Sequence, residues 1–578
     1  MNQEHQKNME RHFFRASAAD FKKIPGSPIA YWVGNKALRA FETGRFVGSC
    51  GSTRKGMATG LNADFVRVWS EISISKIGFD FDREGSSQST LKWFPYANGG
   101  EYRKWYGNYD DVVNWENDGE RLQTDLHESG RVRAVNLNLS YIFSEGLSWT
   151  SITSGSFSIR LLPVGFLFSS ASNALFTNGD SGLFLGLLNS KVHDYLGKVL
   201  NPTLNANPGD VGKIPLLENF HTLEVPTSEL VKISRMDWDS FETSWDFTRL
   251  PLLQSDYRQP TLQATYQQLR AHWWEWTLEM QRLEQANNSI YIEAYGLQGE
   301  LDEKVDLKRV TLTCNPHYRY GGDKVEAELE AQLLADTIAE FLSYAVGCMF
   351  GRYSLDMPGL VLANQGETLA EYLRQVPEPR FMPDEDNVIP LLDGEWFADD
   401  VTERFRTFLR VTFGEENYEE NMAFIEQSLG KDVLKYFIKD FYTDHVKRYK
   451  KRPIYWLFAS PKGTFSALIY LHRYRPDTVS VVLQYLRDFR KKLAARLDYL
   501  QQVGISTSAS QGEKTRALKE IETLKKQLLE LDDYERDTLY PLATEQVPLD
   551  LDDGVKVNYL KLGSALKKIV GLDAKGED

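Results

Sequence analysis

The chain has 578 residues, of which 42% are hydrophobic and 12% aromatic, and this is enough apolar material for three or four folded domains. Its net charge of -14 is unusual for a protein that binds nucleic acid, so the distribution of charge matters more than the sum. The longest apolar run, residues 161–168, is too short to span a bilayer, and residues 1–14 are polar where a secretory signal needs an apolar stretch. We therefore expect a cytoplasmic protein without a membrane partner.

The charge is unevenly distributed along the chain. Residues 1–213 carry 23 Lys and Arg against 21 Asp and Glu, whereas the remainder carries 44 against 60. A near-neutral, arginine-bearing region joined to an acidic body is compatible with DNA binding if its basic groups converge on one face. The three cysteines, Cys50, Cys314 and Cys348, lie far apart, which argues against a disulfide framework and against a structural zinc site.

Residues 199–216 read VLNPTLNANPGDVGKIPL and divide the chain by composition. Three prolines and a Pro-Gly-Asp turn predict a compact loop that is neither helix nor central strand. The preceding residues are rich in Gly, Ser, Asn, aromatic residues and arginine, and the following ones favour helices. Within the first part, Ile29–Val33 suggests a short strand or the start of a buried helix, and the alternation in residues 131–168 predicts several antiparallel strands.

A glycine-rich basic segment covers residues 48–60, where four glycines accompany Thr53, Arg54 and Lys55. The pattern predicts a flexible loop. It is either an ordinary surface loop or one that approaches a DNA backbone, because glycines permit close approach and the basic residues supply charge.

An aromatic and basic segment follows in residues 91–115, where eight aromatic residues interleave with lysine and arginine. The pattern is typical both of contacts to sugars and bases and of a β-rich core with a charged rim. Three further arginines fall in or beside predicted strands, which would fix the direction of their side chains. The candidate DNA-contact residues are therefore Thr53, Arg54, Lys55, Lys92, Arg103, Lys104, Arg131, Arg133 and Arg160.

Helical periodicity dominates the second part of the chain. Near its end, two charged amphipathic segments flank the loop GISTSASQG and predict an antiparallel helical hairpin at about residues 478–540. The hairpin either docks on its own domain or forms a partner surface. The predicted helices are Leu262–Asn287, Lys324–Arg352, Asp399–Phe413, Glu416–Lys450, Thr478–Val503 and Glu513–Tyr540.

A short motif resembles a catalytic one. Residues 315–318 read Asn-Pro-His-Tyr, and adenine-specific amino-methyltransferases place Asn/Asp-Pro-Pro-Tyr after a strand to hold the exocyclic amine. Here histidine replaces the second proline, and no glycine-rich strand-turn-helix for S-adenosylmethionine accompanies the motif. We therefore do not assign a catalytic role to Asn315–Tyr318.

Several longer segments carry a family resemblance. They include TRKGMATGLNADFVRVW (53–69), KWFPYANGGEYRKWYGN (92–108), NPTLN (201–205), SYAVGCMFGRYSLDMPG (343–359) and RPIYWLF (452–458). Over nearly its whole length the chain resembles the carboxy-terminal half of the PglX family, the adenine-specific DNA methyltransferases of BREX phage-defence systems. The resemblance implies a target recognition domain and a helical carboxy-terminal region, and the chain would begin just after the catalytic domain.

The resemblance and the patterns together predict an α+β protein. We expect a β-rich DNA target recognition domain in residues 1–230, a helical linker or core domain in 231–360, and a helical domain with the hairpin in 361–578. The expected function is sequence-specific recognition of duplex DNA for a methyltransferase catalytic domain, in cis or in trans, and other BREX proteins are further candidate partners.

The chain is expected to bind no cofactor or metal, since S-adenosylmethionine belongs to the catalytic domain, and to be inactive on its own. Two alternatives stay open. One is a scaffold for partner docking, organised by the hairpin, and the other is a degenerate methyltransferase that uses Asn315–Tyr318.

Overall fold

A computed structural model describes residues 17–153 and 155–572. The chain forms two compact units, each assembled from separate stretches of sequence. The first takes in the chain up to Val66, Ile77–Asp239 and Ala271–Val325, and the second takes in Arg67–Lys76, Ser240–Arg270 and the chain from Glu326 onward. The turn-rich segment at residues 199–216 therefore lies inside the first unit. The prediction about residues 1–14 falls outside the described residues.

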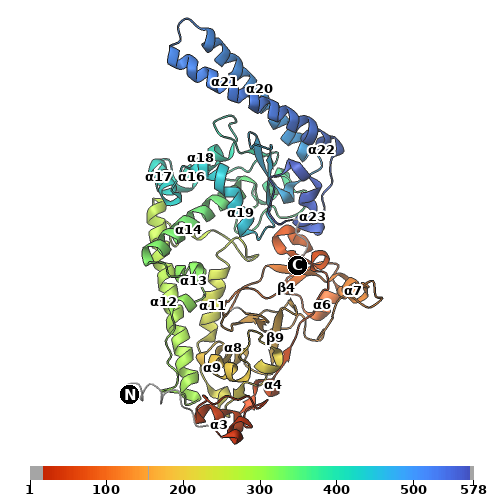
Figure 1. Ribbon diagram of the computed structural model, residues 1–578, viewed down its shortest axis with the longest axis vertical. Helices are drawn as coiled ribbons and strands as arrows, with labels where there is room; N and C mark the ends of the chain where they lie inside the picture. Colours follow the sequence, from red (N-terminus) through yellow and green to blue (C-terminus); the bar gives the residue numbers. More distant parts are fainter. Residues whose placement is uncertain (1–16, 154, 573–578) are drawn as a thin grey trace, which may run out of the picture. The chain divides into compact units, whose positions relative to one another are not determined.

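The first unit combines small sheets with mostly short helices (Figure 1). Its strands are β1 (Arg45–Phe46), β2 (Gly51–Arg54), β4 (Trp93–Ala97), β5 (Asp111–Asn114), β6 (Gly146–Thr150), β7 (Ile159–Leu162), β8 (Leu167–Phe168), β9 (Ser172–Thr177) and β10 (Pro215–Leu216). Its helices are α2 (Ala18–Phe21), α3 (Asn35–Thr43), α4 (Val47–Cys50), α5 (Asn62–Phe65), α6 (Arg83–Gln88), α7 (Glu116–Thr124), α8 (Ser181–Leu188), α9 (Lys191–Leu200), α10 (Pro208–Val211), α11 (Thr227–Trp238) and α13 (Pro316–Tyr320). Strand β3 (Val66–Val68) and helix α12 (Leu262–Ala294) contain points where the chain passes between the units.

The principal sheet of the first unit has the strand order β2-β9-β6-β7, and each neighbouring pair is antiparallel. In a second sheet, β4 pairs antiparallel with β5 and parallel with β8. The aromatic residues of the 91–115 segment mostly fill the core around these strands, since Trp93, Trp105 and Trp115 are fully buried. Burial of such large rings stabilises the unit and favours the core interpretation of that segment over base contact.

In the first unit, the prediction for Ile29–Val33 is wrong, and the antiparallel strands predicted in residues 131–168 are confirmed only from Gly146 onward, as β6 and β7. Ile29 is 74% exposed and lies before α3 in a segment that is neither strand nor helix. Arg131 and Arg133 lie in a loop, because the chain between α7 and β6 forms turns and isolated bridges in place of a ladder. Arg54, by contrast, belongs to strand β2 and not to a flexible loop, since β2 pairs with β9 from Gly51 to Arg54.

The second unit is mainly helical and contains one three-stranded sheet that the sequence did not predict. The sheet has the order β11-β13-β12, and its middle strand is completely buried from Ala467 to Tyr470. Its strands are β11 (Ile389–Pro390), β12 (Tyr455–Ala459) and β13 (Ser466–Tyr470). Its helices are α14 (Glu326–Met349), α15 (Leu369–Gln375), α16 (Val401–Phe413), α17 (Tyr418–Leu429), α18 (Val433–Tyr436), α19 (Tyr442–Arg448), α20 (Thr478–Ile505), α21 (Gln511–Tyr534), α22 (Tyr540–Glu545) and α23 (Gly554–Lys561).

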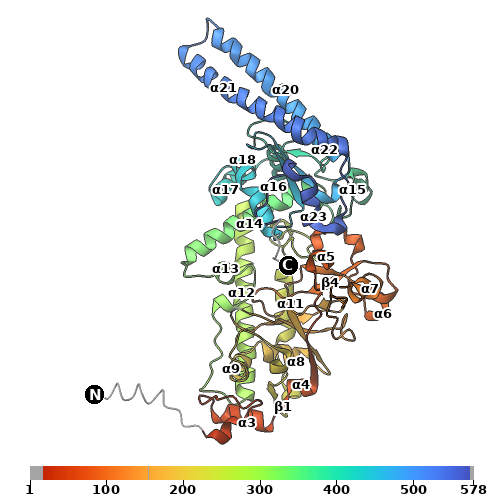
Figure 2. The same cartoon turned by 45° about the vertical axis from the view of Figure 1, so that its right-hand side comes forward.

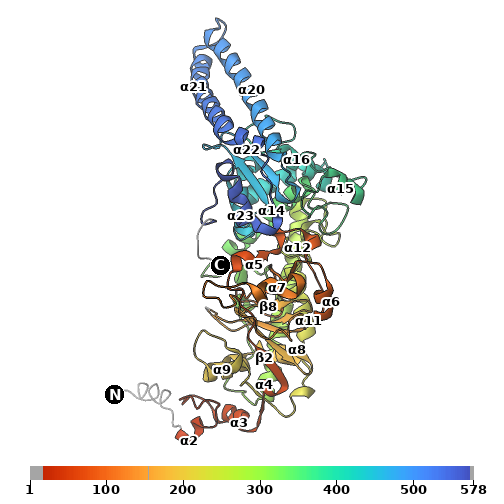
Figure 3. The ribbon, with the colours of Figure 1, turned by 90° about the vertical axis from the view of Figure 1, so that its right-hand side faces the viewer.

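The helical hairpin is confirmed. Helices α20 and α21 lie side by side in all views and are joined by the short loop of residues 506–510 (Figure 2, Figure 3). Ser510 caps α21 through a reciprocal pair of hydrogen bonds with Glu513, which fixes where the second arm begins. Leu493, Leu500, Ile521 and Leu524 are buried along the seam between the arms. The α+β class predicted from the sequence is thus the class of the fold.

None of the described helices combines the length and the apolar character needed to cross a bilayer. Cys50, Cys314 and Cys348 are free thiols, and the latter two are buried. Among residues 17–153 and 155–572, no group of three or more His, Cys, Asp or Glu side chains is placed to hold a metal ion.

Candidate nucleic-acid interface

Two segments of the first unit that are distant in sequence bind each other through their backbones. Ala58 and Val135 exchange both hydrogen bonds of a bridge, at 3.0 and 2.8 Å, and the side-chain amide of Asn138 donates to the carbonyl of Lys55 at 2.8 Å. Gly60 has a φ of +74°, and a Cβ at this position would lie 2.7 Å from the carbonyl oxygen of Arg133, so only glycine fits. We call residues 51–60 and 125–141 together the basic loop pair.

The second segment of this pair turns tightly on itself. The amide of His127 donates to the carbonyl of Arg131 at 2.9 Å, and the amide of Arg133 donates to the carbonyl of Asp125 at 2.8 Å. A further isolated bridge joins Leu126 to Val132. Leu126 and Val132 are 57% and 42% exposed, and Arg131 is exposed beside them. The tip of the turn therefore presents a cation next to apolar side chains, a combination suited to the sugar, methyl and phosphate groups of a DNA groove.

Arg133 is the better oriented arginine of the turn. Its Nε donates to Asp125 Oδ2 at 2.9 Å, and its Nη2 donates to the carbonyl of Leu126 at 3.3 Å. The guanidinium is half-buried and is thus held by two fixed acceptors. Such buttressing reduces the conformational entropy that the side chain loses when it makes a bidentate contact.

Arg54 and Lys55 occupy the first segment of the pair and differ in the contacts of their side chains. The Nη2 of Arg54 donates to the hydroxyl of Tyr141 at 3.0 Å, and its guanidinium carbon lies 4.8 Å from the centroid of that ring. Lys55 is exposed, and its anchoring comes from its carbonyl and not from its ammonium group. Thr53 precedes them on β2 and is half-buried. The structure thus brings Thr53, Arg54, Lys55, Arg131 and Arg133 onto one backbone framework.

Three of the other predicted contact residues are buried inside the first unit. Arg103 is 3% exposed and donates from Nη2 to Asp237 Oδ2 at 2.8 Å and from Nη1 to Thr313 at 3.0 Å. Arg160 on β7 is 1% exposed, and its guanidinium donates to the carbonyl of Arg103 at 3.3 Å. Burial lowers the pKa of Arg160 because the charged form loses its hydration.

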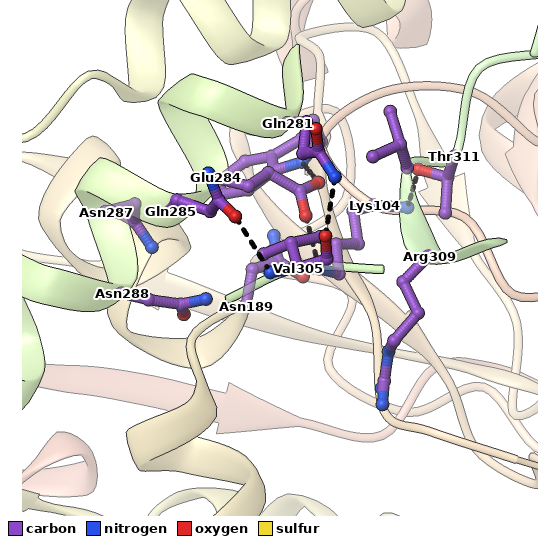
Figure 4. A network of polar contacts seen from close by, with 12 residues as sticks. Lys104, Asn189, Gln281, Glu284, Gln285, Asn287, Asn288, Val305, Arg309 and Thr311 are labelled. Atoms are coloured by element: carbon purple, nitrogen blue, oxygen red, sulfur yellow. Dashed lines mark hydrogen bonds and ion pairs between the residues drawn. The ribbon is translucent and has the colours of Figure 1, made fainter. Parts of the chain in front are cut away.

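Lys104 is the third buried cation (Figure 4). Its Nζ donates to Glu284 Oε2 at 2.8 Å, and the other oxygen of Glu284 accepts from the indole of Trp105 at 2.7 Å. Burial alone lowers the pKa of Lys104, but the carboxylate of Glu284 outweighs it and raises the pKa above its ordinary value. Because Arg103, Lys104 and Arg160 are enclosed, we remove them from the set of side chains that reach DNA.

Lys92, which directly precedes β4, is half-buried, and its Nζ lies 5.5 Å from the ring centroid of Trp93. It belongs to neither segment of the basic loop pair. The structure does not bring it together with the arginines of the turn.

The motif at residues 315–318 is engaged inside the protein. Asn315 is fully buried, its Nδ2 donates to the carbonyls of Leu307 and Val310 at 2.8 Å each, and its Oδ1 accepts from the amide of His317 at 3.2 Å. The carboxamide thus caps α13, donates both of its N–H groups to backbone carbonyls and is enclosed by the protein.

Comparison with known proteins finds two similar sequences. The search of protein-family models finds no match. The chain is 39% identical over 98% of its length to the adenine-specific methyltransferase BrxX of Escherichia coli O9:H4 (strain HS), and 37% identical over 97% to the adenine-specific methyltransferase PglX of Lacticaseibacillus casei (strain Zhang). It covers 47% and 46% of these relatives, so it spans about half their length. Along nearly all of its residues, the chain is therefore similar to part of two adenine-specific methyltransferases.

Proposed function

We propose that this chain recognises double-stranded DNA for an adenine-specific methyltransferase of a BREX phage-defence system, and that it corresponds to the carboxy-terminal half of such an enzyme. The observation that carries the proposal is the similarity, over at least 97% of the chain, to two proteins named as adenine-specific methyltransferases. A DNA methyltransferase must select its site before it acts. The basic loop pair offers exposed and buttressed cations for that task.

Within this proposal, the cations of the basic loop pair divide their roles. Lys55 and Arg131 are exposed and hold phosphates, because mobile side chains suit contacts that carry no sequence information. Arg133 reads a base edge in the major groove, because Asp125 fixes its guanidinium. The proposed contact set is narrower than the nine residues predicted from the sequence.

The methyl donor and the catalytic groups are proposed to lie outside these residues, in a catalytic domain in cis or in trans. Asn315 supports this division because its polar atoms are already bonded inside the protein. Calorimetric titration of the chain with S-adenosylmethionine tests it. Stoichiometric binding of S-adenosylmethionine to the isolated chain would contradict the proposal.

Duplex binding is the primary test of function. Fluorescence anisotropy with a short labelled duplex is measured for the parent chain, for a Lys55→Ala and Arg131→Ala double variant, and for Lys232→Ala as a matched control. Lys232 lies on α11, its side chain is 65% exposed, and it pairs with Glu229 of the same helix. We expect the double variant to lose most of its affinity and the control to keep it. Equal affinities in all three chains would rule out the basic loop pair.

A scaffold organised by the hairpin is the competing function, and one observation favours it. Tyr499, Ile505, Leu518 and Leu529 on α20 and α21 are each more than half exposed, which leaves apolar surface on both arms. Replacing residues 496–520 by a short Gly-Ser loop separates the two functions. If the chain recognises DNA through the first unit, the parent binds duplex and this variant keeps that affinity. If the chain is a scaffold for another protein, the parent binds no duplex.

A further inference from the structure

A second basic feature of the first unit is a pocket of about 260 Å³ beside α9. One wall is α9 with Asn189 before it, and the other is the segment of residues 301–309. Five basic side chains line it, namely Lys104, Lys191, Lys198, Lys304 and Arg309. These residues come from three stretches of the chain that are far apart in sequence, so no local sequence motif predicts the pocket.

The charges of the pocket do not cancel. Lys104 pairs with Glu284, Lys191 with Asp302, and Arg309 with Asp194 at 3.5 Å. Lys198 and Lys304 are exposed at the rim, and among the described residues neither has an ion pair with a carboxylate. The lining itself holds these five cations and a single carboxylate, Asp194, because Glu284 and Asp302 lie outside it, and Asp302 attracts Lys304 as well as Lys191. Like charges held this close repel each other unless an anion lies between them.

The walls of the pocket are held in place by amide side chains of α12 (Figure 4). Gln281 donates to the carbonyl of Val305 at 2.7 Å, and Gln285 accepts from the amide of Val305 at 3.2 Å. Asn288 donates to the carbonyl of Glu303 at 3.1 Å and accepts from the amide of Lys191 at 3.0 Å. Asn288 thereby ties both walls to one helix. A frame of this kind fixes the backbone positions from which the cations extend, so less of the structure has to be ordered when a ligand binds.

A larger hollow adjoins the pocket. It measures about 400 Å³ and shares Asp194 and Lys198 as lining residues. Its lining includes Phe157 and His193, whose rings lie 4.3 Å apart, and the Nδ1 of the buried His193 has no hydrogen-bond partner among the described residues. An aromatic ring and an imidazole nitrogen without a hydrogen-bond partner suit the planar polar part of a ligand whose anionic group binds in the neighbouring pocket.

We propose that the pocket between α9 and residues 301–309 binds a phosphate group, with Lys198 and Lys304 as its direct cationic contacts. The phosphate belongs either to the backbone of duplex DNA or to a free nucleotide. The duplex source rests on the proposed function, whereas the nucleotide source does not. The site is separate from the basic loop pair, since the two share no residue.

The test uses the full chain and a double variant, Lys198→Ala with Lys304→Ala. The probes are inorganic phosphate and a purine mononucleotide, followed by phosphorus NMR, and a short duplex, followed by anisotropy across a salt series. Both lysines are exposed, so the variant is expected to fold. Lys232→Ala controls for the loss of charge. A second double variant, Lys198→Arg with Lys304→Arg, keeps both positive charges and is expected to bind the probes as the parent does.

Two results support the proposal, and each identifies a source. If phosphate and the mononucleotide bind the parent chain, and the alanine variant binds both with about tenfold lower affinity, the ligand is a free nucleotide. If only duplex affinity falls, with a salt slope smaller by about one unit, the ligand is the DNA backbone. The proposal is overturned if the alanine variant binds all three probes as the parent does. Lys55→Ala in parallel reports on the basic loop pair, so failure of the two proposals is distinguishable.

Discussion

Residues 103–104 and residues 131–133 both present closely spaced basic side chains, yet the first pair is buried and the second lies at the surface. The difference is in their partners. Arg103 and Lys104 pair with Asp237 and Glu284, which follow 134 and 180 residues later. Arg133 pairs with Asp125, only 8 residues away. A carboxylate supplied by a distant element draws a cation into the core, whereas one supplied by the same turn leaves it at the edge.

The sharpest way to break this comparison is to remove the buried cation. Arg103→Ala leaves Asp237 buried, with the amides of Thr313 and Cys314 as its remaining donors at 2.7 and 2.9 Å. We expect the free energy of unfolding to fall by about 3–5 kcal/mol, measured by chemical denaturation. Arg131→Ala, in contrast, is expected to stay within about 0.5 kcal/mol of the parent. Similar losses in both variants would show that burial does not separate the two groups.

A buried and an exposed histidine, His193 and His127, differ in the same way, and the buried one predicts that stability depends on pH. Burial lowers the pKa of His193 to about 4, and the nearby Asp194 opposes this only in part. The unfolded chain protonates this residue near its ordinary pKa of about 6.5, so it takes up more protons than the folded chain as the pH falls. Stability is therefore lost between about pH 6.5 and pH 4, by at most about 3 kcal/mol.

Thermal unfolding across this pH range measures the effect. His193→Gln should flatten the acid-side slope, whereas His127→Gln, which changes an exposed ring, should leave it unchanged. A slope that persists in His193→Gln assigns the acid sensitivity to other groups.

For the exposed group of arginines, we expect a substitution of Arg133 to change which DNA sequence the chain prefers. Arg133→Ala should cost about 1–3 kcal/mol of binding at a single base pair, because the side chain is held for a bidentate contact. Asp125→Asn should have a smaller effect of the same kind, since it loosens the guanidinium without removing it. The assay is binding of the chain, together with its catalytic domain, to the recognised site and to single-base variants. Uniform weakening on every sequence would make Arg133 a phosphate contact instead.

The smallest expected effect belongs to Lys55. Lys55→Ala should weaken binding to all sequences alike and lower the salt slope by about one unit, because an exposed ammonium neutralises one phosphate. Duplex affinity measured over a salt series gives the slope directly. If Lys55→Ala altered the preferred site, the division between holding and reading residues would be incorrect.

The sequence predicts elements well where their stabilising contacts are local. Helices α20 and α21 follow from an apolar stripe at helical spacing and a Gly/Ser loop, and the structure begins α20 at the predicted residue Thr478. The predicted helix 416–450 is interrupted after Leu429, where Gly430 adopts a left-handed conformation with φ +67°. Helices often end at a glycine in this conformation. Here the apolar periodicity continues on both sides of Gly430, so the sequence pattern does not reveal the end of the helix.

Elements that depend on distant partners escape such reasoning. Strand β11 pairs with β13, which lies more than seventy residues later, so no residue near Ile389 predicts a strand there. Strands β12 and β13, by contrast, form a local hairpin around residues 460–465, and it was not predicted from the sequence. The candidate site shows the same limit. Lys55, Arg131 and Arg133 could be selected from composition and spacing, but their separation from Arg103, Lys104 and Arg160 needed the carboxylates and carbonyls that only the tertiary fold supplies. Lys198 and Lys304 were not predicted as contact residues, because the pocket that they line is formed by three segments that are far apart in sequence.

The hairpin of α20 and α21 has a consequence for how this chain varies between species. Its arms are joined by their own seam and by ion pairs such as Arg496 with Glu520 at 2.8 Å. Matched turns can therefore be gained or lost from both arms while the seam stays continuous and the three-stranded sheet below keeps its packing. Among homologues, we expect insertions and deletions in this region to come in paired multiples of a helical turn, which would make the arm a variable spacer on a constant body.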